Sequence, residues 1–250
     1  MNSRRSEVAL FATLLAASIL VYSARWQVFG EPLLRNEMWR FLLGDVAFLF
    51  LQVAVVSLVV DRILRSREKR AIRQKLNMVI GAFFSQFGTA LLGRTSRMDS
   101  ALDAVRKDLI PKQEWTAADF AVAKASLRAH RPLVDVATCD LGGLMEAVVC
   151  EKQFVLGLLG NQALLEHEEF SELLWAVTHL AEEFEARDSL DDMPLPDQVH
   201  LRGDIERVYV LLVHEWLAYA QHLQSRYPYL FSLAMRTNPL DPTARAAVTS

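Results

Sequence analysis

The sequence has few of the residues, and none of the short motifs, that mark redox and nucleotide-binding proteins. Its 250 residues include two cysteines, and Cys139 and Cys150 form neither a CxxC pair nor a zinc-finger spacing. The ten glycines build no phosphate-binding loop, no nucleophile elbow and no kinase pattern. We therefore expect two reduced, structural thiols and no recognisable catalytic motif.

Strand signals are also missing after residue 62. The sequence shows no sustained alternation of apolar and polar residues and few runs of β-branched residues. Apolar residues recur instead at three- and four-residue steps, which is typical of amphipathic helices. Asp140 and the segment Thr116-Ala-Ala-Asp119 have the form of helix N-terminal caps. The predicted fold is all-α, with a break at residues 93–96. The helices expected after that break cover residues 98–109, 117–130, 141–159, 166–187, 197–226 and 229–235.

Charged residues are almost absent from two stretches near the N-terminus. Residues 8–24 contain none, and residues 41–60 contain only Asp45. A helix of about 20 mostly apolar residues crosses the hydrocarbon core of a membrane, with about 17 as the lower limit. The sequence therefore predicts an N-terminal two-helix transmembrane hairpin followed by a cytoplasmic helical bundle. A cleaved signal peptide is the alternative for the first stretch, although Tyr22 stands where cleavage favours a small residue.

A dense run of basic residues follows the second apolar stretch, whereas the loop between the two stretches is only weakly basic. Positive side chains near short loops stay in the cytoplasm, so both termini are expected there, in a multi-pass protein of the cell membrane. The basic residues are also expected to contact anionic lipid head groups of the bilayer. The rest of the chain has no comparable basic surface, and the net charge is −3, which argues against a nucleic-acid partner. The membrane-surface residues are Arg62, Arg65, Arg67, Lys69, Arg70, Arg73 and Lys75.

These patterns divide the chain into four predicted segments. Residues 1–62 form the hairpin, with spans at about 8–24 and 41–60, and residues 63–95 form a basic and amphipathic juxtamembrane helix. Residues 96–238 form the bundle, and residues 239–250 form a flexible tail. The juxtamembrane helix has an apolar stripe, which we expect to pack on the same domain rather than on a membrane surface or in a coiled-coil dimer. This stripe comprises Leu76, Ile80, Phe83, Phe87 and Ala90.

Histidines and carboxylates gather on the two longest helices expected in the bundle. His200 and Asp204 lie four residues apart beside the apolar stripe of helix 197–226, so they can touch. Helix 166–187 contains His179-x-x-Glu182, the reverse of the Glu-x-x-His order of di-iron bundles. The favoured interpretation is a network of charge pairs between helices, with no cofactor. The alternative is an iron, manganese or zinc site formed by His179, Glu183, His200, Asp204 and His222.

Three stretches carry a family resemblance. They are residues 75–84 (KLNMVIGAFF), residues 164–170 running into 174–179 (LWAVTH), and residues 227–239. Together with the hairpin they resemble a family of uncharacterised bacterial membrane proteins that have two spans and a cytoplasmic helical domain. The resemblance implies a bacterial cytoplasmic membrane and brings no known activity or site residue.

The function predicted from these observations is that of an integral membrane protein presenting a helical interaction or regulatory module. A homodimer or a protein partner would then use the bundle. The second hypothesis is a membrane-tethered metal-dependent enzyme built on the histidines and carboxylates of helices 166–187 and 197–226. Sensing of a small molecule by the bundle is a third possibility.

Overall fold

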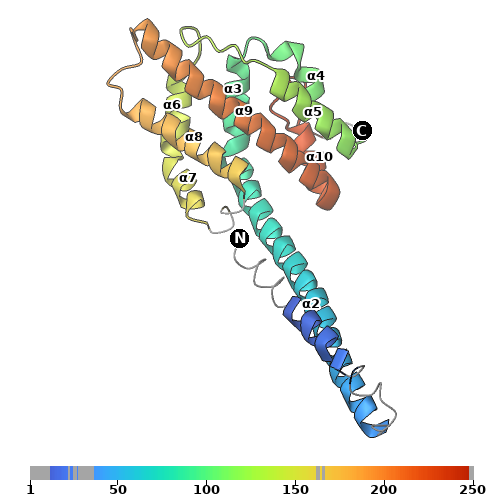
Figure 1. Ribbon diagram of the computed structural model, residues 1–250. Coiled ribbons are helices and arrows are strands. Elements are labelled where there is room, and N and C mark those ends of the chain that lie inside the picture. Colours follow the sequence, from blue (N-terminus) through green and yellow to red (C-terminus); the bar gives the residue numbers. More distant parts are fainter. Residues whose placement is uncertain are drawn as a thin grey trace. The chain divides into compact units, whose positions relative to one another are not determined.

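The chain is helical throughout the part that the structure describes. The computed structural model describes residues 12–21, 23, 24, 27, 37–161, 164 and 167–247. Over these residues the only β-structure is an isolated antiparallel bridge between Asp99 and Val134, so the predicted all-α class is confirmed. The chain divides into two compact units, Met1–Ala71 and Ile72–Ser250 (Figure 1).

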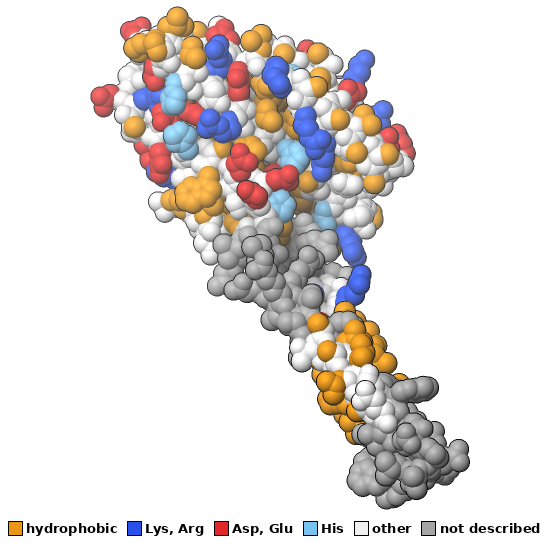
Figure 2. Space-filling view, viewed as in Figure 1, with side chains coloured by type: hydrophobic (Ala, Val, Ile, Leu, Met, Phe, Trp, Pro, Cys, Tyr) orange, Lys and Arg blue, Asp and Glu red, His pale blue; other side chains and the backbone are white. Residues whose placement is uncertain are grey.

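The first unit contains a short helical stretch, Ala12–Val21, and the beginning of α2 (Glu37–Phe83). Between residues 46 and 64, α2 exposes large apolar side chains around its circumference, and Val55, Val56 and Leu58 are 50%, 53% and 48% exposed. Figure 2 shows hydrophobic side chains along this part of α2. A helix that is apolar on all sides is typical of a buried or lipid-facing segment.

The predicted transmembrane hairpin is not supported by a test of length and composition. Among the described residues, one helical stretch passes as a candidate span, Gln74–Met98, and 56% of its apolar window is buried inside the fold. A core helix of this kind passes the same test without entering a membrane. The predicted spans at 8–24 and 41–60 each include residues or side chains outside the described set, and neither is found as a candidate.

The core of the second unit begins where α2 ends. Leu76, Ile80, Phe83 and Phe87 are buried against the rest of this unit, as the apolar stripe predicts. Ala90, the last residue of that stripe, is exposed instead. The reason is a π-helical turn, η2 (Phe84–Gly88), which joins α2 to α3 (Thr89–Met98). A π-turn adds a residue to the helical repeat, so the buried face continues through Leu91 and Leu92.

The bundle is built around a hairpin of two long helices. The helices α8 (Glu168–Glu185) and α9 (Leu195–Arg226) lie side by side, with α6 (Leu141–Cys150) and α7 (Lys152–Leu159) against α8 (Figure 1). The helices α3, α5 (Ala117–Ala129) and α10 (Pro228–Arg236) pack on α9. The apolar stripes predicted for the two long helices are buried, except that Tyr219 is half-buried. Two short elements, η3 (Leu102–Ala104) and α4 (Arg106–Leu109), connect α3 to α5.

Both predicted N-terminal caps form. Asp140 accepts a hydrogen bond from the Gly143 amide at 2.9 Å, and Asp119 accepts one from the Thr116 amide at 2.7 Å. These bonds satisfy amides that the first turn of a helix leaves without an intrahelical partner. The caps therefore set the starts of α6 and α5 where the sequence predicts them.

Several predicted boundaries differ from the structure. The break expected at residues 93–96 is absent, because α3 continues through it and the hydroxyl of Thr95 bonds to the Leu91 carbonyl at 3.0 Å within the helix. Pro239 packs beside Gly93, since a Cβ there would lie in ordinary contact with it, at 3.4 Å. The expected helix 98–109 is interrupted, and helix 141–159 divides into α6 and α7 at Glu151. Leu240 is fully buried, so the start of the predicted flexible tail belongs to the core.

Candidate metal centre

The end of α8 and the start of α9 each contribute a histidine and a carboxylate spaced four residues apart. On α8 the pair is His179 and Glu183, and on α9 it is His200 and Asp204. Residues four apart lie on the same face of a helix, so each pair projects from one side. Because the chain turns back between the two helices, the two pairs face each other.

The four side chains converge on a single point. One ligand atom from each residue lies within 4.8 Å of the other three. The Nε2 atom of His200 is 3.4 Å from Asp204 Oδ2 and 3.5 Å from Glu183 Oε1. The Nε2 atom of His179 is 3.7 Å from each of the same two oxygens.

These separations are closer to the distance between two ligands of one metal ion than to the length of a hydrogen bond. Hydrogen bonds from nitrogen to oxygen are about 2.7–3.2 Å long. Two ligands about 2.1 Å from a tetrahedral zinc ion lie about 3.4 Å from each other, by simple geometry. The four histidine–carboxylate distances span 3.4–3.7 Å, which is close to this ligand–ligand separation.

One carboxylate oxygen of Asp204 has no hydrogen-bond partner at the centre of this group. Its side chain is 5% exposed, and its Oδ2 atom is buried without a hydrogen-bond partner. A buried carboxylate oxygen needs a hydrogen bond or a cation to offset the loss of water. The position of Oδ2, facing both imidazoles, makes it the natural inner ligand of an ion held there.

Arginines hold the outward oxygens of both carboxylates. Arg187 Nη1 donates to Glu183 Oε2 at 2.7 Å, and Arg207 Nη1 donates to Asp204 Oδ1 at 3.2 Å. The hydrogen bond from Arg187 lowers the pKa of Glu183. Arg187 also pairs with Asp197 at the start of α9, which lowers the pKa of Asp197 in turn. Such contacts orient metal-binding carboxylates and keep them ionised.

The group is accessible from solvent on one side. The side chains of His179 and His200 are 45% and 54% exposed, whereas Asp204 is buried. Figure 2 shows histidine side chains beside acidic and basic ones on the visible face of the second unit. An ion could therefore enter and leave without opening the core.

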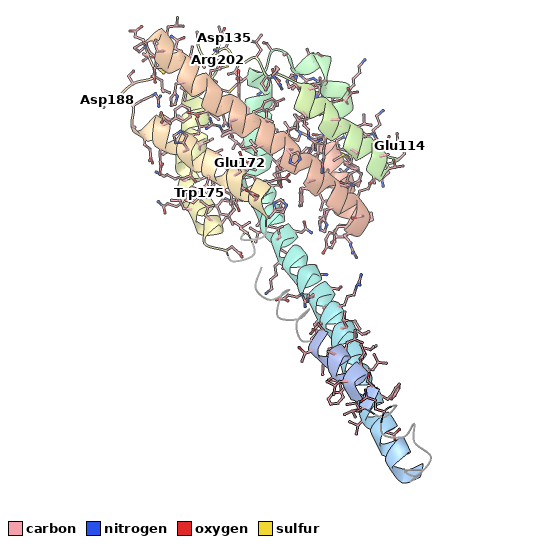
Figure 3. All side chains as sticks on the ribbon, viewed as in Figure 1. Glu114, Asp135, Glu172, Trp175, Asp188 and Arg202 are labelled. Carbon is pink, nitrogen blue, oxygen red and sulfur yellow. The ribbon has the colours of Figure 1, made fainter. Side chains whose placement is uncertain are left out.

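The structure brings together four of the five candidates predicted from the sequence. His222 is the exception, because it lies eighteen residues beyond Asp204 on α9, about 27 Å further along the helix. Its ring packs against Tyr227, and burial lowers its pKa. Glu182 is also remote, since its carboxylate faces Lys152 at 3.6 Å. Glu172, labelled in Figure 3, is exposed on α8 and belongs to none of these contacts.

The supporting residues Arg187, Asp197 and Arg207 were not assigned to the site from the sequence. A signal for two of them exists in the spacing: Arg187 follows Glu183 by four residues, and Arg207 follows Asp204 by three. Each chain segment therefore has a histidine, a carboxylate and an arginine at one-turn intervals, with Arg187 just beyond the end of α8. This repeated order is the pattern that would have indicated the site.

The fold and this group of side chains define a helical-bundle protein with a two-histidine, two-carboxylate cluster. Comparison with known families places the chain more narrowly. Residues 72–236 match the family described as "Uncharacterized protein MJ1433, C-terminal helical domain", and residues 2–64 match "MJ1433, N-terminal helical domain". The chain therefore belongs to the MJ1433 family. The two matched regions fall on either side of the division between the structural units at Ala71.

A relative supports the same assignment. The chain is 39% identical to "Uncharacterized protein MJ1433" of Methanocaldococcus jannaschii over 241 residues, which covers 96% of each protein. That organism is an archaeon, so the bacterial origin implied by the sequence resemblance does not hold for the whole family. No solved structure matches the chain.

Proposed function

We propose that this protein is a membrane-anchored helical module that binds a transition-metal ion through His179, Glu183, His200 and Asp204. The observation that carries the proposal is the convergence of these four ligand atoms within 4.8 Å of one another. Imidazole and carboxylate donors suit zinc, iron and manganese. Zinc is the first candidate because the histidine–carboxylate distances fit a tetrahedral shell.

The number of protein ligands favours a binding or regulatory role over catalysis. Structural zinc sites use four protein ligands, whereas catalytic sites keep a position open for water or substrate. The four side chains here would supply the four ligands of a tetrahedral ion. A bound ion would join the end of α8 to the start of α9 and hold the hairpin closed. Metal occupancy would then control which bundle surface a protein partner or a second copy meets.

The enzyme hypothesis retains one supporting observation. The two histidines are about half exposed, so a substrate could approach an ion of higher coordination number. Cobalt substitution separates the two roles, because four-coordinate cobalt absorbs visible light far more strongly than six-coordinate cobalt. A strong spectrum that is unchanged by added anions supports a closed regulatory centre. A weak spectrum that anions change supports an open, catalytic one.

The membrane anchor is proposed from the first unit. The apolar side chains exposed along α2 between residues 46 and 64 would face lipid, together with those of Ala12–Val21. Arg62, Arg67 and Lys75 follow on the same helix and are exposed. Basic residues beside an anionic leaflet contribute about 1 kcal/mol each. Both termini would lie in the cytoplasm, with the hairpin in the cell membrane.

Orientation can be read from a native cysteine. Cys150 is exposed, whereas Cys139 is partly buried and its pKa is raised by burial, which lowers its reactivity. A membrane-impermeant maleimide should label Cys150 only after cells are opened, with Cys150→Ser as the blank. Labelling in intact cells would contradict the proposed topology. Release of the protein by alkaline carbonate would contradict the anchor.

The metal proposal is tested by metal analysis of the full-length protein purified in detergent. After loading with zinc and removal of excess, His200→Ala and Asp204→Asn should each hold about one ion fewer than the wild type. His222→Ala is the matched control, since it removes a histidine from the same helix away from the cluster. Glu172→Gln is the corresponding control on α8. Equal zinc content in all five proteins would refute the proposal.

A further inference from the structure

A second group of ionisable side chains lies elsewhere along the same two helices. It contains His167, Glu169 and Glu215, which offer ligand atoms within 4.8 Å of one another, and His214 lies beside them. Glu215 follows Asp204 by eleven residues, which corresponds to about 16 Å along α9. The two groups therefore share no ligand and can be tested separately.

Glu215 is the unusual member of this group. The residue is fully buried, and neither of its carboxylate oxygens has a hydrogen-bond partner. Burying an ionised carboxylate without a partner costs several kcal/mol, which proteins offset with a hydrogen-bonded cation or a metal ion. The Nδ1 atom of His214 lies 3.6 Å from Glu215 Oε1, which is too long for a hydrogen bond.

The surrounding groups indicate which atoms are free to hold an ion. His167 Nδ1 accepts a hydrogen bond from the Phe170 amide at 3.1 Å, so the proton of the neutral ring is on Nε2. In this tautomer His167 has no free nitrogen lone pair with which to bind an ion. His214 Nδ1 faces Glu215 Oε1 and also lies 3.9 Å from Glu169 Oε2. One imidazole nitrogen and two carboxylates remain as inner ligands.

We infer that His214, Glu169 and Glu215 form a second cation site, for a divalent ion that prefers oxygen ligands, such as manganese. Two carboxylates and one imidazole form a harder donor set than the two histidines of the first centre. Three protein ligands leave positions for water, and Glu169 and His214 connect the site to solvent because their side chains are 65% and 18% exposed. The N-terminus of α8 carries a partial positive charge of about half an elementary charge, which disfavours a cation. The two carboxylate charges of Glu169 and Glu215 are larger, so the site still attracts a cation.

The test is a manganese titration of the full-length protein in detergent, in which electron paramagnetic resonance measures the free ion. The titration uses the Asp204→Asn background, which disables the first centre. This protein should bind one manganese ion, and adding Glu169→Gln should weaken that binding at least 10-fold. Glu168→Gln is the control, because Glu168 is the exposed neighbour outside the group. Glu169 is also exposed, so its variant should fold.

The possible outcomes separate this inference from the proposed zinc centre. Manganese binding that survives Asp204→Asn and is lost with Glu169→Gln or Glu215→Gln supports the second site, whatever the first centre binds. Absence of manganese binding in the Asp204→Asn protein overturns the inference. So does binding that Glu169→Gln leaves unchanged.

Discussion

Replacement of Asp204 by asparagine separates metal binding from folding. The substitution keeps the shape of the side chain but removes the charge of the buried Oδ2 atom, which faces both imidazoles. Without metal, it loses the ion pair with Arg207, whose side chain is 57% exposed, and it relieves the burial of a charge. The arginine end of this pair is screened by solvent, and removal of the buried charge offsets the loss of the pair, so the metal-free stability should change little.

In the presence of zinc, the thermal stability of the wild type should differ strongly from that of Asp204→Asn. An ion present at about 1,000 times its dissociation constant stabilises the folded state by about 4.1 kcal/mol. For a domain of about 150–250 residues, each kcal/mol raises Tm by about 2–4 °C. Zinc should therefore raise the wild-type Tm by about 8–16 °C and leave that of Asp204→Asn almost unchanged.

The assay is thermal unfolding of the purified protein in detergent, once with a chelator and once with excess zinc. His222→Ala should show the full zinc-induced rise, because His222 lies outside the cluster. A zinc-induced rise in Asp204→Asn equal to that of the wild type would refute the assignment. A large loss of stability without metal would instead identify Asp204 as a structural residue.

Three further predictions concern the scaffold around the site. Arg187 lowers the pKa of Glu183 and Asp197 from their ordinary values of 4.5 and 3.8, so the stability that these carboxylates contribute should be complete above those values and lost as the pH falls through the lowered pKa values. Arg187→Met should therefore reduce the loss of stability at acid pH that chemical denaturation measures. An unchanged loss at acid pH would contradict the network. Asp99→Ala should cost about 1–3 kcal/mol in urea unfolding, because it leaves the buried ring of His130, 2.6 Å from the Asp99 carboxylate, without its hydrogen-bond partner. A cost near zero would show that the pair is not structural. Gly88→Ala should destabilise the domain by about 1–3 kcal/mol, because a Cβ at the end of the π-helical turn would overlap the buried ring of Phe83. A neutral effect on Tm would show that the ring moves freely.

Local sequence patterns predicted most of the helices in the second unit. The caps at Asp140 and Thr116 and the apolar stripes of the long helices are local signals, and the structure follows them. The phase shift at residues 84–88 was not predictable in this way, because a π-turn preserves the helical composition while rotating the buried face. The break predicted at Gly93 was wrong for a related reason. Glycine can mark either a helix break or a contact with another segment, and here Pro239 packs beside it.

The site was only partly predictable for a geometric reason. Helical periodicity gives the direction in which a side chain projects from a helix, so His200 and Asp204 were correctly expected to touch. It does not give the position of one helix along another, which depends on the turn between α8 and α9. His222 is a different case, because the rise of a helix alone places it about 27 Å from Asp204 along α9, so the sequence could have excluded it. The family comparison supplies membership but no site residue.

The most direct test of the metal centre is X-ray absorption spectroscopy of the full-length protein loaded with one equivalent of zinc. The proposed ligands predict four nitrogen and oxygen neighbours at about 2.0–2.1 Å, with outer-shell scattering from two imidazole rings. A sulfur neighbour at about 2.3 Å, or a shell of oxygen atoms without imidazole scattering, would contradict the assignment.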